Sequence, residues 1–137
     1  PVTVSALYAG AIWLAHVPRV YQAALTDPAV HLLLVALLLA VGYLFWTTLI
    51  RGSAAGGILM AFAALVQTGL LGALLTFAPT PWYPVFASRA APWGLTPLED
   101  QQLAGLIMWV PMGAVYLAAG LAALARLLAR LDVAVPR

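Results

Sequence analysis

The residues with metal-binding chemistry are few in this sequence and lie near the ends of apolar segments. The only two histidines are His16 and His31, and two of the four acidic residues are the neighbours Glu99 and Asp100. Imidazole nitrogens combined with a carboxylate or a thioether form a ligand set for copper or zinc. Two isolated histidines at helix ends are more often interfacial hydrogen-bonding residues. Residue types alone therefore leave both interpretations open.

Two methionines follow the acidic pair. Met108 and Met112 are four residues apart, so they share one face of a helix. Thioethers suit Cu(I), but Met108 lies about 13 Å along that helix from Glu99 at a rise of about 1.5 Å per residue. Apolar packing is therefore the favoured role of both methionines.

Composition places the chain in a lipid bilayer. Of its 137 residues, 65% are hydrophobic and 7% are charged, whereas soluble domains carry roughly 25% charged residues. The six basic residues are scattered arginines, so no nucleic-acid partner is expected. The absence of cysteine excludes disulfides, thiolate metal sites and cysteine nucleophiles. No hydrolase, phosphate-loop or dinucleotide motif is present, so an autonomous enzyme is not expected.

Apolar segments predict an all-α integral membrane bundle in one domain over residues 1–137. The predicted transmembrane helices cover about 2–17, 29–50, 54–78 and 97–131. The segment 29–50 would be about 33 Å long, enough to span the hydrocarbon core, while the first segment is short for a span of about 20 residues. A short interfacial helix at 19–25 is expected between Pro18 and a turn at Asp27.

Small residues predict where the helices pack closely, because they let helix backbones approach in lipid. The third segment offers glycines, and the fourth offers an alanine at every fourth position. These residues are Gly56, Gly57, Gly69, Gly72, Ala114, Ala118 and Ala122.

A proline- and aromatic-rich outer loop separates the last two segments. Prolines between residues 79 and 92 prevent a continuous helix there. Trp82, Tyr83 and Trp93 are suited to the headgroup level. Thr96 and Glu99 have the spacing of a capping box, which predicts that the last helix starts at Pro97.

The arginines predict the orientation in the membrane. With four spans, Arg51, Arg126, Arg130 and Arg137 share one side, and Arg19 and Arg89 the other. The positive-inside rule then places both termini in the cytoplasm and the loop 79–96 in the periplasm. This topology gathers His16, His31 and residues 99–102 near one leaflet, beneath the loop.

Two long motifs carry a family resemblance. The loop TFAPTPWYPVF with the following WGLTPLEDQQLAGLIMWVPMGAVYL, and the earlier WLAHVPRVYQAAL, resemble the C-terminal half of the CtaG family of cytochrome c oxidase assembly factors. These are bacterial inner-membrane proteins implicated in copper supply to haem–copper oxidases. The resemblance implies copper as cofactor, with His16 and His31 as ligands. Its implied supporting or docking residues are Glu99, Asp100, Gln101, Trp82, Tyr83 and Trp93.

The chain also departs from the family pattern. His31 matches the first residue of a His-x-x-Glu-His run, but Leu34 and Val35 replace the glutamate and the second histidine. Two functions are therefore expected. One is assembly of a haem–copper oxidase by copper delivery. The other is a non-catalytic accessory subunit of a larger respiratory or photosynthetic complex, with a degenerate metal site. The partners in both are the lipid bilayer and other membrane subunits.

Overall fold

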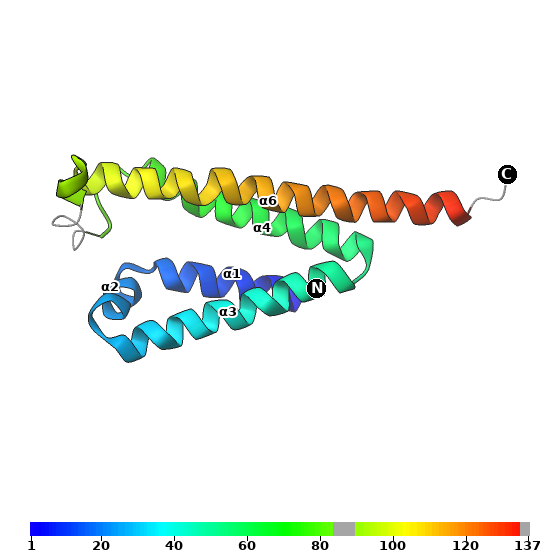
Figure 1. Ribbon diagram of the computed structural model, residues 1–137, viewed down its shortest axis with the longest axis horizontal. Helices are drawn as coiled ribbons and strands as arrows, with labels where there is room; N and C mark the ends of the chain where they lie inside the picture. The colour runs from blue at the N-terminus through cyan, green and yellow to red at the C-terminus, as the bar shows by residue number, and fades with distance from the viewer. Residues whose placement is uncertain (84–89, 135–137) are drawn as a thin grey trace.

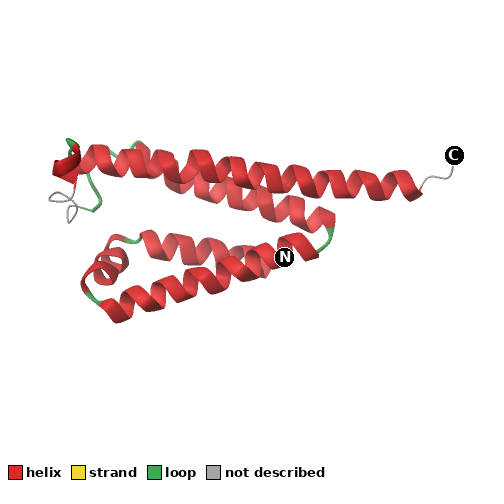
Figure 2. Ribbon diagram, viewed as in Figure 1, coloured by secondary structure: helices red, strands yellow, loops and turns green. Residues whose placement is uncertain are grey.

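The computed structural model describes residues 1–83 and 90–134, and the regular elements in these ranges are all helical (Figures 1 and 2). They form two antiparallel pairs, α1 with α3 and α4 with α6. The elements are α1 Val2–His16, α2 Pro18–Thr26, α3 Pro28–Arg51, α4 Ala54–Thr76, the 3-10 turn η2 Ala91–Trp93, and α6 Pro97–Ala134.

The two ends of the bundle are built differently (Figure 1). At one end, here called the turn end, α3 and α4 are joined by the short connection Gly52–Ser53. At the other, the loop end, α2, the segment after α4 and the start of α6 lie together. Helix α6 continues beyond the turn end of α4, so its last turns project from the bundle.

Local capping explains where the long helices start. The Asp27 carboxylate accepts from the backbone N–H of Ala29 at 2.8 Å, and Pro28 occupies the first turn of α3. At α6 the Thr96 hydroxyl accepts from the Glu99 N–H at 3.2 Å, while the Glu99 carboxylate accepts from the Thr96 N–H at 2.8 Å. The capping box predicted at this point is confirmed.

Three of the helices are long and apolar enough to cross a membrane: α3, α4 and residues 97–132 of α6. Helix α1 is equally apolar but has 15 residues, which is shorter than the about 20 residues of a typical span. The all-helical membrane architecture predicted from the sequence is therefore supported, with three candidate spans and one shorter apolar helix.

A buried aromatic cluster joins the two helix pairs. The Tyr8 ring of α1 stacks on Phe45 of α3 with centroids 4.2 Å apart. The Tyr8 hydroxyl shares a hydrogen bond of 2.7 Å with the hydroxyl of Tyr116 on α6. Phe45 and Tyr116 are 0% and 1% exposed. Because the two hydroxyls satisfy each other, the aromatic rings can be buried without an unpaired polar group.

Helices α4 and α6 approach most closely where glycines face the partner helix. A Cβ added at Gly72 would lie 2.5 Å from the Cβ of Trp109, and one at Gly105 would lie 2.8 Å from the Gly72 carbonyl oxygen. Gly57 also lies in this contact, with its Cβ position 3.2 Å from Ala123. By contrast, Gly69 has nothing within 4 Å of its Cβ position.

The close-packing face of α6 differs from the predicted one. Ala114, Ala118 and Ala122 are exposed, while the α4 side of the helix carries Gly113, Tyr116, Gly120 and Ala123. One position along a helix is a rotation of about 100°. The alanine repeat is therefore turned away from α4, and the four-residue spacing alone did not identify the partner-facing side. Gly56 lies at the start of α4, and a Cβ added there would lie 2.9 Å from the Oγ of Ser53, the N-cap of the same helix.

Candidate functional site

A cavity of about 330 Å³ at the loop end collects side chains from both helix pairs. It is called here the loop-end cavity. It lies where α1 ends and α6 begins, so residues distant in sequence share one space. Its lining residues are His16, Tyr21, Leu75, Tyr83, Pro97, Asp100, Gln101, Ala104 and Met108.

His16 is positioned by its own helix. It is the last residue of α1, is half-buried, and its Nδ1 lies 2.7 Å from the carbonyl oxygen of Ile12. A carbonyl oxygen only accepts hydrogen bonds, so Nδ1 must be the protonated nitrogen. In the neutral imidazole the lone pair is then on Nε2, which is the form of histidine that binds metal ions.

Tyr83 fastens the loop to the end of α1. Its hydroxyl donates to the carbonyl oxygen of His16 at 2.6 Å, and its ring lies against Tyr21 with centroids 4.9 Å apart. Burial, and then the neighbouring Tyr21, raise the pKa of Tyr83 to about 12. The phenol therefore stays protonated at neutral pH and remains a hydrogen-bond donor.

Gln101 connects α6 with α4 and the loop. It is 5% exposed, its Nε2 donates to the carbonyl oxygen of Leu75 at 3.4 Å, and its Oε1 accepts from the backbone N–H of Trp82. The neighbouring Gln102 donates to the carbonyl oxygen of Ala78 at 3.4 Å. Gln101 is thus engaged in holding the wall of the cavity.

Two further polar or polarisable groups come from one face of α6. Asp100, Ala104 and Met108 follow each other at four-residue spacing and all line the loop-end cavity. With His16 they line the cavity with one imidazole, one carboxylate and one thioether, but Asp100 and Met108 are about 12 Å apart along α6, so the three groups do not converge on one ion. In the described ranges, no group of three or more His, Cys, Asp or Glu side chains is placed to hold a metal ion.

The structure separates the two histidines predicted as ligands. His31 is exposed in the first turn of α3 and does not line the loop-end cavity. Glu99 is also exposed, and its carboxylate is occupied by the capping box with Thr96. Of the predicted set, His16, Asp100, Gln101 and Tyr83 are brought together.

The two tryptophans predicted as docking residues, Trp82 and Trp93, do not line the loop-end cavity. Trp93 is 82% exposed in η2, and Trp82 lines a separate apolar hollow near the end of α4 with Leu74 and Phe77. Residues 84–89 of the predicted loop, with Arg89 and also Arg137, lie outside the described ranges.

Sequence reasoning missed Tyr21 and assigned Met108 to packing alone. Tyr21 lies in α2, a helix with a polar and an apolar face. That amphipathic pattern predicts the helix, but it does not predict that Tyr21 lines the cavity. For Met108, the four-residue spacing from Asp100 and Ala104 was the available signal.

The comparisons with known proteins point to one family. A family model described as "Cytochrome c oxidase caa3 assembly factor" matches residues 1–130. No curated protein and no solved structure matches the chain. The family match covers most of the chain and agrees with the motifs in the loop and at the start of α6. The chain therefore belongs to the caa3 assembly factor (CtaG) family, as the sequence resemblance predicted.

Proposed function

We propose that this protein assists the assembly of a haem–copper cytochrome c oxidase by handing copper to it from the loop-end cavity. The family match over residues 1–130 carries the proposal. It gives the role of assembly factor, and the cavity supplies a place where that role could be performed. Copper is the cargo in this account rather than a resident cofactor.

The donor set of the cavity suits a transient cargo. His16 offers Nε2 as its free nitrogen, because Nδ1 is engaged by Ile12. The Asp100 carboxylate and the Met108 thioether line the same cavity about 12 Å apart along α6, so the proposal pairs His16 with one of them at a time. Imidazole and thioether ligands suit Cu(I), and one residue of each type binds less tightly than a closed cage of several. A delivery protein must also release its ion, which favours such an open set.

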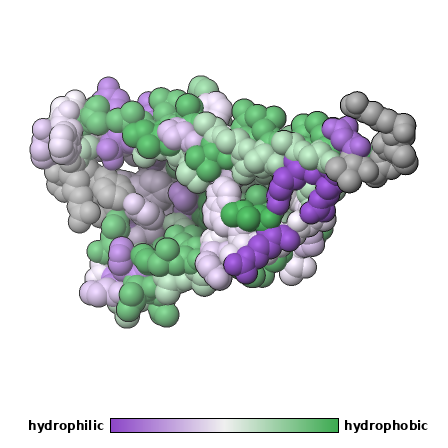
Figure 3. All heavy atoms as spheres, turned by 45° about the vertical axis from the view of Figure 1, so that its right-hand side comes forward, coloured by the Kyte–Doolittle hydropathy of each residue, from purple (hydrophilic) through white to green (hydrophobic). Residues whose placement is uncertain are grey.

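The proposed orientation places the cavity on the periplasmic side of a bacterial inner membrane. Arg51 and Arg126 lie at the turn end, and hydrophilic side chains gather there, near the C-terminal part of α6 (Figure 3). The positive-inside rule assigns that end to the cytoplasm. In this arrangement α1 also crosses the membrane, which brings the number of spans to four, and α2 lies at the outer interface. Partner subunits of the oxidase approach from the loop end.

One observation favours the second function, an accessory subunit without a metal. Among the described residues, no cluster of three or more His, Cys, Asp or Glu side chains is formed. In that case the same fold would serve to pack against a larger membrane complex. Copper binding distinguishes the two functions directly.

The test is Cu(I) loading of the purified, chelator-treated protein in detergent. We expect one copper per chain, with binding lost in His16→Ala and retained in His31→Ala. The second variant is the matched control, because it removes the other histidine without touching the cavity. A protein that stays metal-free after loading, or equal binding by both variants, would contradict copper handling at this site.

A further inference from the structure

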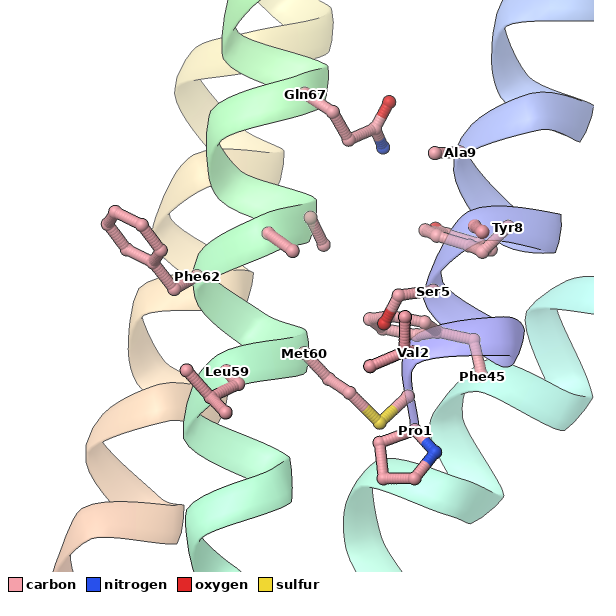
Figure 4. A pocket seen from close by; sticks show the side chains of 13 residues that line it. Pro1, Val2, Ser5, Tyr8, Ala9, Phe45, Leu59, Met60, Phe62 and Gln67 are labelled. Atoms are coloured by element: carbon pink, nitrogen blue, oxygen red, sulfur yellow. The ribbon is translucent and has the colours of Figure 1, made fainter.

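A second and larger cavity, of about 550 Å³, lies between α1 and α4 on the side of the bundle (Figure 4). It is called here the lateral cavity. Its rim carries Val2, Leu59 and Phe62, which are 83%, 68% and 64% exposed. These side chains belong to apolar helices, so the cavity opens toward the hydrocarbon of the membrane. An occupant would therefore enter from the lipid phase.

Two buried polar atoms in the wall of this apolar space lack a partner. The Ser5 Oγ and the Gln67 Nε2 are buried, and neither has a hydrogen-bond partner among the residues described. Both residues line the lateral cavity. In Figure 4, Gln67 extends from α4 across the cavity toward Ala9 on α1. Buried donors are nearly always satisfied, so these atoms indicate a ligand that accepts hydrogen bonds.

The orientation of the Gln67 amide is fixed by its neighbour. The indole Nε1 of Trp13 donates to the Gln67 Oε1 at 3.0 Å. Indole N–H groups only donate, so this contact requires the amide oxygen on the Trp13 side. The two protons on Nε2 are consequently left for a separate acceptor.

The floor of the cavity is aromatic and uncharged. Tyr8 and Phe45 both line it, and their rings are stacked with centroids 4.2 Å apart. The Tyr8 hydroxyl is already bonded to Tyr116, and the two stacked residues are 8% and 0% exposed, so they form a closed apolar floor. No charged side chain is among the lining residues. A flat, neutral ring fits such a surface better than a charged headgroup does.

From these observations we infer that the lateral cavity binds a neutral, membrane-soluble carbonyl compound of the quinone type. Its ring would lie in the cavity above the closed floor that Tyr8 and Phe45 form, and its carbonyl oxygens would accept from Gln67 Nε2 and Ser5 Oγ. A saturated acyl chain would leave both donors unpaired. The volume lies within the usual range of small-ligand sites. The inference concerns binding only, and it does not depend on copper delivery.

The test uses a short-chain prenylated benzoquinone and the purified protein in detergent. Quenching of tryptophan fluorescence reports binding, because Trp13 is bonded to Gln67. We expect saturable quenching by the wild type. Gln67→Leu should weaken binding about tenfold, and Ser5→Ala should weaken it about threefold, as losses of single hydrogen bonds. Thr47→Val on α3, which removes a hydroxyl outside the lining, should leave the affinity unchanged.

A second variant separates loss of the site from loss of the fold. Ala6 is exposed and lines the cavity, so Ala6→Phe can fill the space with little strain in the core. It should abolish saturable quenching while the thermal unfolding midpoint stays near that of the wild type. Quenching that only rises linearly with quinone, or equal affinity in wild type and Gln67→Leu, would overturn the inference. The inference would also be overturned if, in membranes, a transmembrane polypeptide crosslinked to the Phe62 position and the protein bound no quinone.

Discussion

The turn end and the loop end use their polar side chains in opposite ways. At the turn end, the Arg126 guanidinium donates to the carbonyl oxygens of Ile50 and Leu49, at 2.5 and 3.3 Å. At the loop end, Tyr83 and Gln101 hold backbone groups, but His16 lines a cavity and has only its Nδ1 engaged, by the Ile12 carbonyl oxygen. At the turn end, the Arg126 side chain is thus engaged in closing the bundle. Polar side chains at the loop end leave donor atoms available for a ligand.

Both ends depend on the tight contact between α4 and α6, and breaking it should have the largest effect. In Gly105→Ala the new Cβ would lie 2.6 Å from the Thr76 Oγ1 and 2.9 Å from the Thr76 nitrogen. Because backbone atoms cannot yield, the helices must separate. We expect the free energy of unfolding to fall by about 3 kcal/mol, measured by denaturant unfolding in detergent. Gly69→Ala, which meets nothing within 4 Å, is the matched control and should not destabilise. Equal effects of the two variants would contradict this packing.

Removing the Arg126 hydrogen bonds should loosen the turn end alone. Arg126→Met keeps much of the apolar stem but leaves the last carbonyls of α3 without their donors. We expect a loss of about 2 kcal/mol in the free energy of unfolding. Hydrogen exchange should rise around residues 49–57 and stay unchanged near residue 101. Arg130→Met, at an exposed position of the same helix, provides the control. Faster exchange at the loop end would argue against two independent ends.

The reciprocal change at the loop end is Gln101→Leu. It removes the donor to Leu75 and the acceptor for the Trp82 N–H, and leaves that N–H unpaired. We expect a loss of about 1 kcal/mol and faster exchange of the Trp82 amide, with no change at the turn end. Gln102→Leu removes one long hydrogen bond to Ala78 and should have the smaller effect. A larger loss of stability in Gln102→Leu than in Gln101→Leu would show that Gln101 is not the main support of the cavity.

The smallest effect at neutral pH is expected from Tyr83→Phe, which removes one hydrogen bond to His16. The pKa of Tyr83 is raised from 10.0 to about 12, chiefly by burial. The folded state therefore holds this proton more tightly than the unfolded state does. The stability contribution is fully present below about pH 10 and is lost as pH rises through about 12. The measurement is the ultraviolet absorbance of tyrosinate as a function of pH. The difference between the wild type and Tyr83→Phe should show this group ionising near pH 12. Ionisation near 10 would contradict the buried placement.

The sequence predicted the helices better than their contacts. Prolines, caps and apolar length located the α-helices, because these signals are local, while the 3-10 turn η2 was not predicted. Partner-facing sides depend on neighbouring helices, so the exposed Ala114, Ala118 and Ala122 could not be told from the half-buried Gly113 and the buried Ala123 by spacing alone.

The lining of the loop-end cavity was also predicted only in part, because it depends on contacts between helices. Topology correctly directed His16 and Asp100 to one end, since both lie at helix termini there. It also directed His31 to that end, but exposure on α3 keeps this side chain out of the loop-end cavity. Whether two residues at one end share a cavity depends on helix rotation, which the spacing of His16 and His31 does not encode.

The most direct test of the central claim is oxidase maturation in cells that lack the native gene for this protein. The copper content and activity of the assembled oxidase would be measured after complementation with wild type, His16→Ala, His31→Ala or Arg130→Met, each at matched membrane levels. The account predicts that His16→Ala fails to restore the copper-loaded oxidase and that the other two variants succeed. Full maturation with His16→Ala would contradict a function at the loop-end cavity.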